Sequence, residues 1–219
     1  MNDLRATISW LLLVMVGVVG AGAAVLGISQ APKNVPLHKA VENTLAASSY
    51  TEMVTQSSPQ GTQTDFLVYQ APDRLGGYIQ SGTKRTYVYV IGNYEYQSLA
   101  TVRTASSRHL VFYQQPSEGV SAVDPAYNYL TYATKAKGIT SSGSTYTFTL
   151  TQNGQTGTFV YTVSGNYVST FSVSVQTASV HLAISQVGTS PPVALPPGAK
   201  VISSPAGSSA PGGSASSAG

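Results

Sequence analysis

Hydrophobic and polar positions alternate over short runs between residues 51 and 186, which is typical of strands with one buried face. Tyr146, Phe148 and Leu150 alternate with threonines, and Val180 begins a second run of the same kind. Gly, Asn, Pro and Ser separate the runs and favour tight antiparallel turns. The pattern therefore predicts an antiparallel meander with strands at 51–56, 64–70, 75–81, 86–91, 94–101, 110–114, 145–152, 158–164, 167–176 and 179–186.

Two other segments follow a helical period. Leu37, Val41 and Leu45 recur at every fourth position in the segment that opens at residue 36, which predicts an amphipathic helix lying across a sheet. In DPAYNYLTYATKAKG, at 124–138, Asp124 is a candidate N-cap and Pro125 suits the first helical position. We therefore expect a second helix inside the strand-rich region.

The N-terminal segment ISWLLLVMVGVVGAGAAVLGI, at 8–28, is an uncharged run of 21 residues. At 1.5 Å per residue such a helix crosses a hydrocarbon core of about 30 Å. The competing interpretation is a cleaved signal peptide, because Ala-Gly-Ala at 21–23 has the form that signal peptidases accept. Apolar residues continue past that point, so we favour a retained transmembrane helix with the C-terminal domain extracytoplasmic; cleavage would make the protein secreted.

The chain divides by composition into a membrane segment, a folded domain and a polar tail. From residue 203 onward Ser, Gly, Pro and Ala dominate, and such a segment cannot bury enough apolar surface to offset its ordering entropy. We predict a short cytoplasmic flank at 1–7, a transmembrane helix or signal anchor at 8–28, a linker at 29–35, a β-rich domain at 36–202 and a disordered tail at 203–219.

Little in the sequence points to catalysis or to nucleic acid. The chain has no cysteine, its charged residues amount to 9%, and no basic run exceeds Lys84-Arg85. No nucleophile or metal motif occurs, and His38, His109 and His181 stand in ordinary surface contexts. We therefore expect no enzyme activity, no catalytic residues, no metal site, no cofactor and no nucleic-acid partner.

Tyrosine is abundant, with 14 residues, many of them on the predicted strands. Its apolar ring and polar hydroxyl suit the rim of a pocket for an apolar ligand or a glycan-binding surface. Tyrosine also simply favours strands, so both interpretations remain open.

Three sequence features resemble those of the LolA-like family of bacterial envelope proteins, in particular the actinobacterial LppX and LprG type. They are APDR at 71–74, VIGNYEYQS at 90–98 and QVGTSPPVALPPGAKV at 186–201. The resemblance implies an α+β fold: a strongly curved antiparallel sheet, an open half-barrel, with helices covering a concave face that holds acyl chains. This chain lacks the acylated cysteine of the lipoprotein members, so a transmembrane helix would replace the lipid anchor.

Together these observations predict a single-pass, membrane-anchored extracytoplasmic lipid-binding protein that takes part in envelope lipid or lipoprotein handling. Its partners would be the membrane, through 8–28, a lipid or acyl-chain ligand, and envelope proteins. The alternative is a non-enzymatic structural or protein- or glycan-interaction ectodomain of the cell envelope. The residues expected to line a lipid site are Leu37, Val41, Leu45, Tyr87, Tyr89, Phe148 and Leu150.

Overall fold

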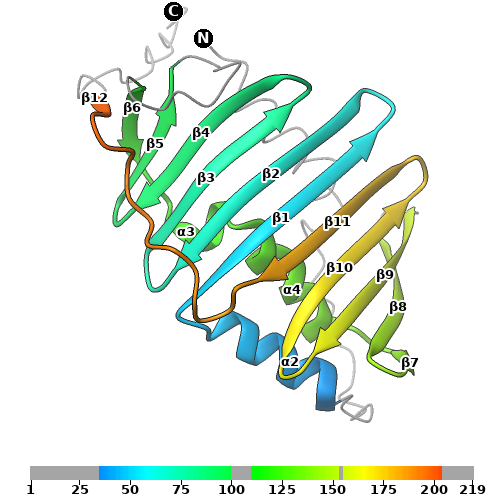
Figure 1. The fold of residues 1–219 in the computed structure, drawn as a ribbon. Helices are drawn as coiled ribbons and strands as arrows, with labels where there is room; N and C mark the ends of the chain where they lie inside the picture. Colours follow the sequence, from blue (N-terminus) through cyan, green and yellow to red (C-terminus); the bar gives the residue numbers. More distant parts are fainter. Residues whose placement is uncertain (1–34, 100–109, 153–154, 204–219) are drawn as a thin grey trace, which may run out of the picture.

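Twelve strands form one open, curved sheet with short helices on one side of it (Figure 1). This computed structural model describes residues 35–99, 110–152 and 155–203. The strand order is β12-β6-β5-β4-β3-β2-β1-β11-β10-β9-β8-β7. The strands are β1 (Ser49–Ser58), β2 (Gly61–Gln70), β3 (Arg74–Ser81), β4 (Lys84–Ile91), β5 (Tyr94–Ser98), β6 (Val111–Pro116), β7 (Thr140–Ser142), β8 (Thr145–Gln152), β9 (Gln155–Ser164), β10 (Tyr167–Val175), β11 (Ala178–Ser185) and β12 (Lys200–Ser203).

The sheet consists of two meanders, β1–β6 and β7–β11, instead of the single meander predicted from the turns. The antiparallel pairing of β1 with β11 joins them, with Val54 opposite Leu182. Between the meanders, the chain runs through α3 (Val120–Val123) and α4 (Pro125–Lys135) from one half of the sheet to the other. The short strand β12 pairs in parallel with β6, a contact that no local pattern predicts.

The helices define an inner face of the sheet, which is the face that they cover in Figure 1. On the β8–β11 half this face is filled by α2 (Val35–Leu45) and α4. Phe171, fully buried, stacks on Tyr129 of α4 at 5.0 Å between ring centroids. The Tyr161 hydroxyl donates a 2.8 Å hydrogen bond to the Tyr129 carbonyl. This half of the inner face is therefore a solid aromatic core.

Thr44 fixes α2 on this core. Its hydroxyl donates to the Ala40 carbonyl at 2.7 Å and accepts from the Val168 backbone N–H of β10 at 3.0 Å. A buried hydroxyl that both donates and accepts a hydrogen bond has a low desolvation cost, and its two hydrogen bonds orient the helix. The amphipathic helix predicted across the sheet is thus present, with its apolar stripe facing strands.

The opposite, outer face is partly covered by the segment that connects β11 to β12, which crosses in front of the sheet in Figure 1. Val193 in this segment is buried, and its carbonyl accepts a 3.1 Å hydrogen bond from Arg74 Nη1. A Cβ on Gly76 would clash with the Tyr89 ring and with Val193, so glycine leaves room for that ring beneath the segment that connects β11 to β12. Phe112, fully buried, packs edge-on against that ring.

The curved antiparallel sheet with helices on one face agrees with the predicted α+β open half-barrel, and both predicted helices and all ten predicted strands are present. None of the helices among the described residues is long and apolar enough to cross a membrane. The predicted transmembrane segment at 8–28, its flank at 1–7 and nearly all of the predicted tail lie outside the described residues. Those assignments remain predictions.

Candidate functional site

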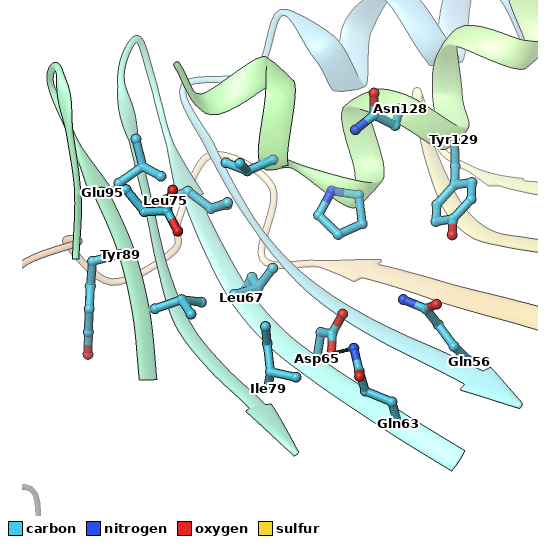
Figure 2. Close-up of a pocket in the computed structure, with 14 residues that line it drawn as sticks. Gln56, Gln63, Asp65, Leu67, Leu75, Ile79, Tyr89, Glu95, Asn128 and Tyr129 are labelled. Atoms are coloured by element: carbon cyan, nitrogen blue, oxygen red, sulfur yellow. Dashed lines mark hydrogen bonds between the residues drawn. The ribbon is translucent and has the colours of Figure 1, made fainter. Parts of the chain in front are cut away.

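A pocket lies on the inner face of the β1–β5 half, beside α3 and the start of α4 (Figure 2). Its volume is about 110 Å³, which corresponds to roughly 7 to 11 groups the size of a water molecule or a methylene. The walls are mostly apolar with a few polar groups, the usual character of a small-molecule site. Its lining consists of Gln56, Gln63, Asp65, Leu67, Leu75, Ile79, Val88, Tyr89, Val90, Glu95, Val123, Pro125, Asn128 and Tyr129.

Strand register explains why the floor of the pocket is apolar. Leu67 of β2 lies opposite Gly77 of β3, which in turn lies opposite Val88 of β4, so all three positions share the inner face. Leu75 and Val90 are cross-strand partners one row away, and both are buried. Gly77 contributes no side chain to this row, and a Cβ there would clash with the Phe66 backbone of β2. Figure 2 shows Leu67, Leu75 and Ile79 pointing from the strands toward the cleft.

One end of the pocket is polar and centres on Asp65 of β2. Its carboxylate is 5% exposed, and Oδ1 accepts a 2.9 Å hydrogen bond from Gln63 Nε2. Burial raises the pKa of Asp65 to about 6, although hydrogen bonds from Gln63 and Gln56 partly offset the rise. Near neutral pH this end of the pocket therefore carries a negative charge held by neutral amides.

Behind the pocket, two further carboxyls meet at the N-terminus of α4. Asp124 is the N-cap, as predicted: Oδ1 accepts from the Tyr127 N–H at 3.1 Å, and Oδ2 accepts from the Tyr50 hydroxyl at 2.6 Å. Glu52 Oε2 accepts from the Ala126 N–H at 2.9 Å. The helix N-terminus supplies positive dipole charge to both groups.

Glu52 and Asp124 lie near enough for the charge of one to affect the pKa of the other. Burial, followed by the neighbouring Asp124 charge, raises the pKa of Glu52 well above its ordinary range. Burial also raises the pKa of Asp124, but the hydrogen bonds from Tyr50 and Tyr127 oppose that rise. The donors therefore favour the negative charge on Asp124 and the proton on Glu52. Glu52 Oε1 is buried and has no hydrogen-bond partner among the described residues, which also favours the neutral, protonated form of this carboxyl.

This carboxyl pair is placed to hold a helix and not to meet a substrate. Glu52 is fully buried, Asp124 is 1% exposed, and neither lines the pocket. No histidine lines the pocket, and the described residues contain no group of acids and histidines that could hold a metal ion. His181 lies on the outer face, exposed, within 2.9 Å of the Ser172 hydroxyl.

The predicted lipid-lining residues fall into two groups, of which the first lies in the filled core. Leu37 and Val41 are completely buried, and Phe148 stacks between the rings of Phe159 and Tyr161. Their apolar side chains are buried, but they contact the protein's own side chains and do not line the pocket. Leu45 and Leu150 pack against the same core, partly buried.

The second group, Tyr87 and Tyr89, lies on the outer face, and the expected inward orientation is corrected. Tyr87 pairs with Tyr78, whereas its neighbour Val88 takes the inner side. Tyr89 borders the pocket through its strand, but its ring points away from the cleft in Figure 2. In β4 both parities carry apolar side chains, so alternation alone does not tell which one faces the helices.

Sequence reasoning missed the residues that form the actual pocket and its acidic surroundings. One signal was present: Glu52 lies two residues from both Tyr50 and Val54, and Asp65 lies two residues from Leu67, so each acid shares the buried face of its strand with apolar residues. A charged residue at such a position indicates a buried polar site. No local sequence pattern predicts that Glu52 lies near Asp124.

No family model matches this chain, and no curated protein matches it. Among solved structures, the chain is similar to the lipoprotein LppX of Mycobacterium tuberculosis, with 12% identity and a TM-score of 0.47 over 74% of this chain and 97% of that one. It is also similar to LprF from Mycobacterium bovis, with 11% identity and a TM-score of 0.42 over 74% and 95%.

Proposed function

We propose that this protein is a membrane-anchored, extracytoplasmic binding protein that holds an acyl chain of a lipid in the pocket between β1–β5 and α3–α4. The observation that carries the proposal is the apolar cleft left open where the helices do not fill the inner face. Its floor of Leu67, Leu75 and Val90 offers apolar contact, and a volume of about 110 Å³ suits one acyl segment better than a whole multi-chain lipid.

The role proposed is binding and handling of envelope lipid or lipoprotein, without catalysis. The acids that approach one another are sealed from solvent, and the acids that line the pocket have no histidine beside them there. A reacting group would need a partner within hydrogen-bond reach of the ligand. Anchoring through 8–28 is supported by the length and apolarity of that segment.

Native mass spectrometry of the full-length chain purified from membranes tests the proposal. We expect a co-purifying lipid in the wild type and in Gln80→Trp, and its loss in Ile79→Trp. Ile79 points into the cleft, whereas the next residue of β3 points to the outer face, so the two tryptophans differ mainly in where their volume goes. Equal lipid occupancy in both variants, or none in the wild type, would count against the proposal.

A second candidate, an interaction ectodomain, is favoured by a row of apolar side chains across the outer face. Met53, Phe66, Tyr78 and Tyr87 are successive cross-strand neighbours, and the first two are 44% and 37% exposed. Phe66 stacks on Tyr78 at 5.6 Å, and the Arg85 guanidinium lies 4.4 Å from the same ring. Flat aromatic surfaces with a polar edge suit proteins and glycans.

This second candidate has its own test. Replacing Met53 and Phe66 by serine should leave lipid binding unchanged and abolish in-cell crosslinking to an envelope protein or glycan. If the crosslinked products persist in the double variant, the outer row is not the contact surface.

A further inference from the structure

The charge of the pocket restricts which lipids it can hold. Two carboxyls, Asp65 and Glu95, are among its lining residues, and no lysine, arginine or histidine of the described part of the chain belongs to that lining. Arg85 turns to the outer face, where its Nε donates to Gln80 Oε1 at 2.8 Å. Lys84, at the hairpin end of β4, is exposed and does not line the pocket.

An anionic headgroup in this pocket would lie beside Asp65, a buried carboxylate that forms no ion pair with any residue the structure describes. Asp65 is 5% exposed, so water screens it poorly, and like charges at close range in such surroundings repel strongly. Burying a second unpaired carboxylate or phosphate there would add its own desolvation cost. A hydroxyl or an ammonium group has the opposite effect, because each donates hydrogen bonds to a carboxylate.

The polar lining residues reinforce this preference. Gln63 donates to Asp65, so it orients the carboxylate and does not compete for the ligand's donor. Gln56 and Asn128 add neutral amides, which can accept from a hydroxyl through their carbonyl oxygens. In Figure 2 Gln56 and Gln63 lie beside Asp65, away from the leucine floor, whereas Asn128 lies on α4, farther from Asp65. An acyl chain on the floor would therefore place its head near acceptors.

We propose, resting on the function proposed above, that the pocket selects amphiphiles whose head is a hydrogen-bond donor without negative charge, such as an alcohol or an amine, and rejects carboxylates and phosphates. The ligand class is thus a hydroxyl- or amine-bearing lipid and not a free fatty acid or a phosphate headgroup buried in the pocket. Asp65, at the polar end, sets the selectivity, and Glu95, which lies beside Leu75 in Figure 2, adds a second carboxyl to the lining.

Three ten-carbon ligands of the same chain length test the selectivity: decan-1-ol, decylamine and decanoate. Calorimetric titration of the full-length chain, kept in solution with an amphipol, gives their affinities at pH 8. We expect the alcohol and the amine to bind at least about tenfold more tightly than decanoate, a difference of about 1.4 kcal/mol. In Asp65→Asn the difference in affinity between these two ligands and decanoate should fall to about threefold or less. The amine should then bind no more tightly than the alcohol.

The outcomes separate this inference from the proposed function. Decanoate binding as tightly as decan-1-ol would overturn the selectivity while leaving lipid binding intact. Absence of binding for all three ligands, with wild type and Ile79→Trp indistinguishable, would overturn lipid binding itself. Glu95→Gln, a change on a different strand, gives a second measure: it should narrow the gap in the same direction, and an unchanged gap in both variants would contradict the assignment.

Discussion

The Tyr50 hydroxyl donates a 2.6 Å hydrogen bond to Asp124 Oδ2, and this contact joins the first strand of the sheet to the N-cap of α4. Both groups are at most 1% exposed. The contact sets where α4 begins on the inner face. Because Pro125 and Tyr129 of that helix line the pocket, the same contact fixes one wall of the site.

Tyr50→Phe should destabilise the fold without changing its shape. The substitution keeps the ring that stacks on Tyr69 but leaves Asp124 buried with one donor fewer. We expect the free energy of unfolding to fall by about 1–3 kcal/mol, measured by urea denaturation. Tyr167→Phe, at an exposed tyrosine, is the matched control and should change stability by less than about 0.5 kcal/mol. Equal effects of the two variants would contradict a structural role for the Tyr50 hydroxyl.

Asp65→Asn should stabilise the protein above pH 6 and have little effect near pH 4. The pKa of Asp65 is raised from 3.8 to about 6 on folding. The contribution of its protonated carboxyl to the free energy of unfolding is therefore fully present below about pH 3.8 and is lost as pH rises through about 6. The free energy of unfolding falls by about 3 kcal/mol over this range, and a protein with asparagine at position 65 does not show this fall. Urea midpoints of both proteins from pH 4 to pH 8 check this, with curves that converge at the acid end.

Parallel pH curves for wild type and Asp65→Asn would show that Asp65 is not the group responsible. Glu52→Gln provides the matched comparison, because the pKa of Glu52 is also raised by burial and the same sign applies. A glutamine there keeps an acceptor for the Ala126 N–H and cannot ionise.

Phe171→Ala should be among the most damaging single truncations in the described part of the chain. The ring is completely buried and packs against Tyr129, Phe159 and Tyr161. Its removal should cost about 3–5 kcal/mol, measured by thermal or urea unfolding. Phe66→Ala removes the same side chain from the outer face, where the ring is 37% exposed, and should cost clearly less. Similar losses from both truncations would contradict the division into a filled inner half and an exposed outer row.

The sequence predicted local structure well because strand and helix periods depend on residues that are close together in the sequence. The alternation through Phe148 placed that side chain on a buried face correctly, and Asp124 was identifiable as an N-cap. The sequence did not predict which face of β4 points toward the helices, because Tyr87 and Val88 are both suited to a core. Interactions between distant segments, such as that of Glu52 with Asp124, depend on the path of α3 and α4 across the sheet. No local pattern predicts them.

The central claim is that an acyl chain occupies the cleft floored by Leu67 and Leu75, and photo-crosslinking tests it most directly. A decyl alcohol with a diazirine on its terminal carbon is irradiated with the full-length protein, and the modified residues are mapped by peptide mass spectrometry. We predict adducts on the pocket lining of β2–β4 and α3–α4, lost in Ile79→Trp and kept in Gln80→Trp. Adducts confined to the outer row around Phe66 and Tyr78, or unaffected by Ile79→Trp, would contradict the account.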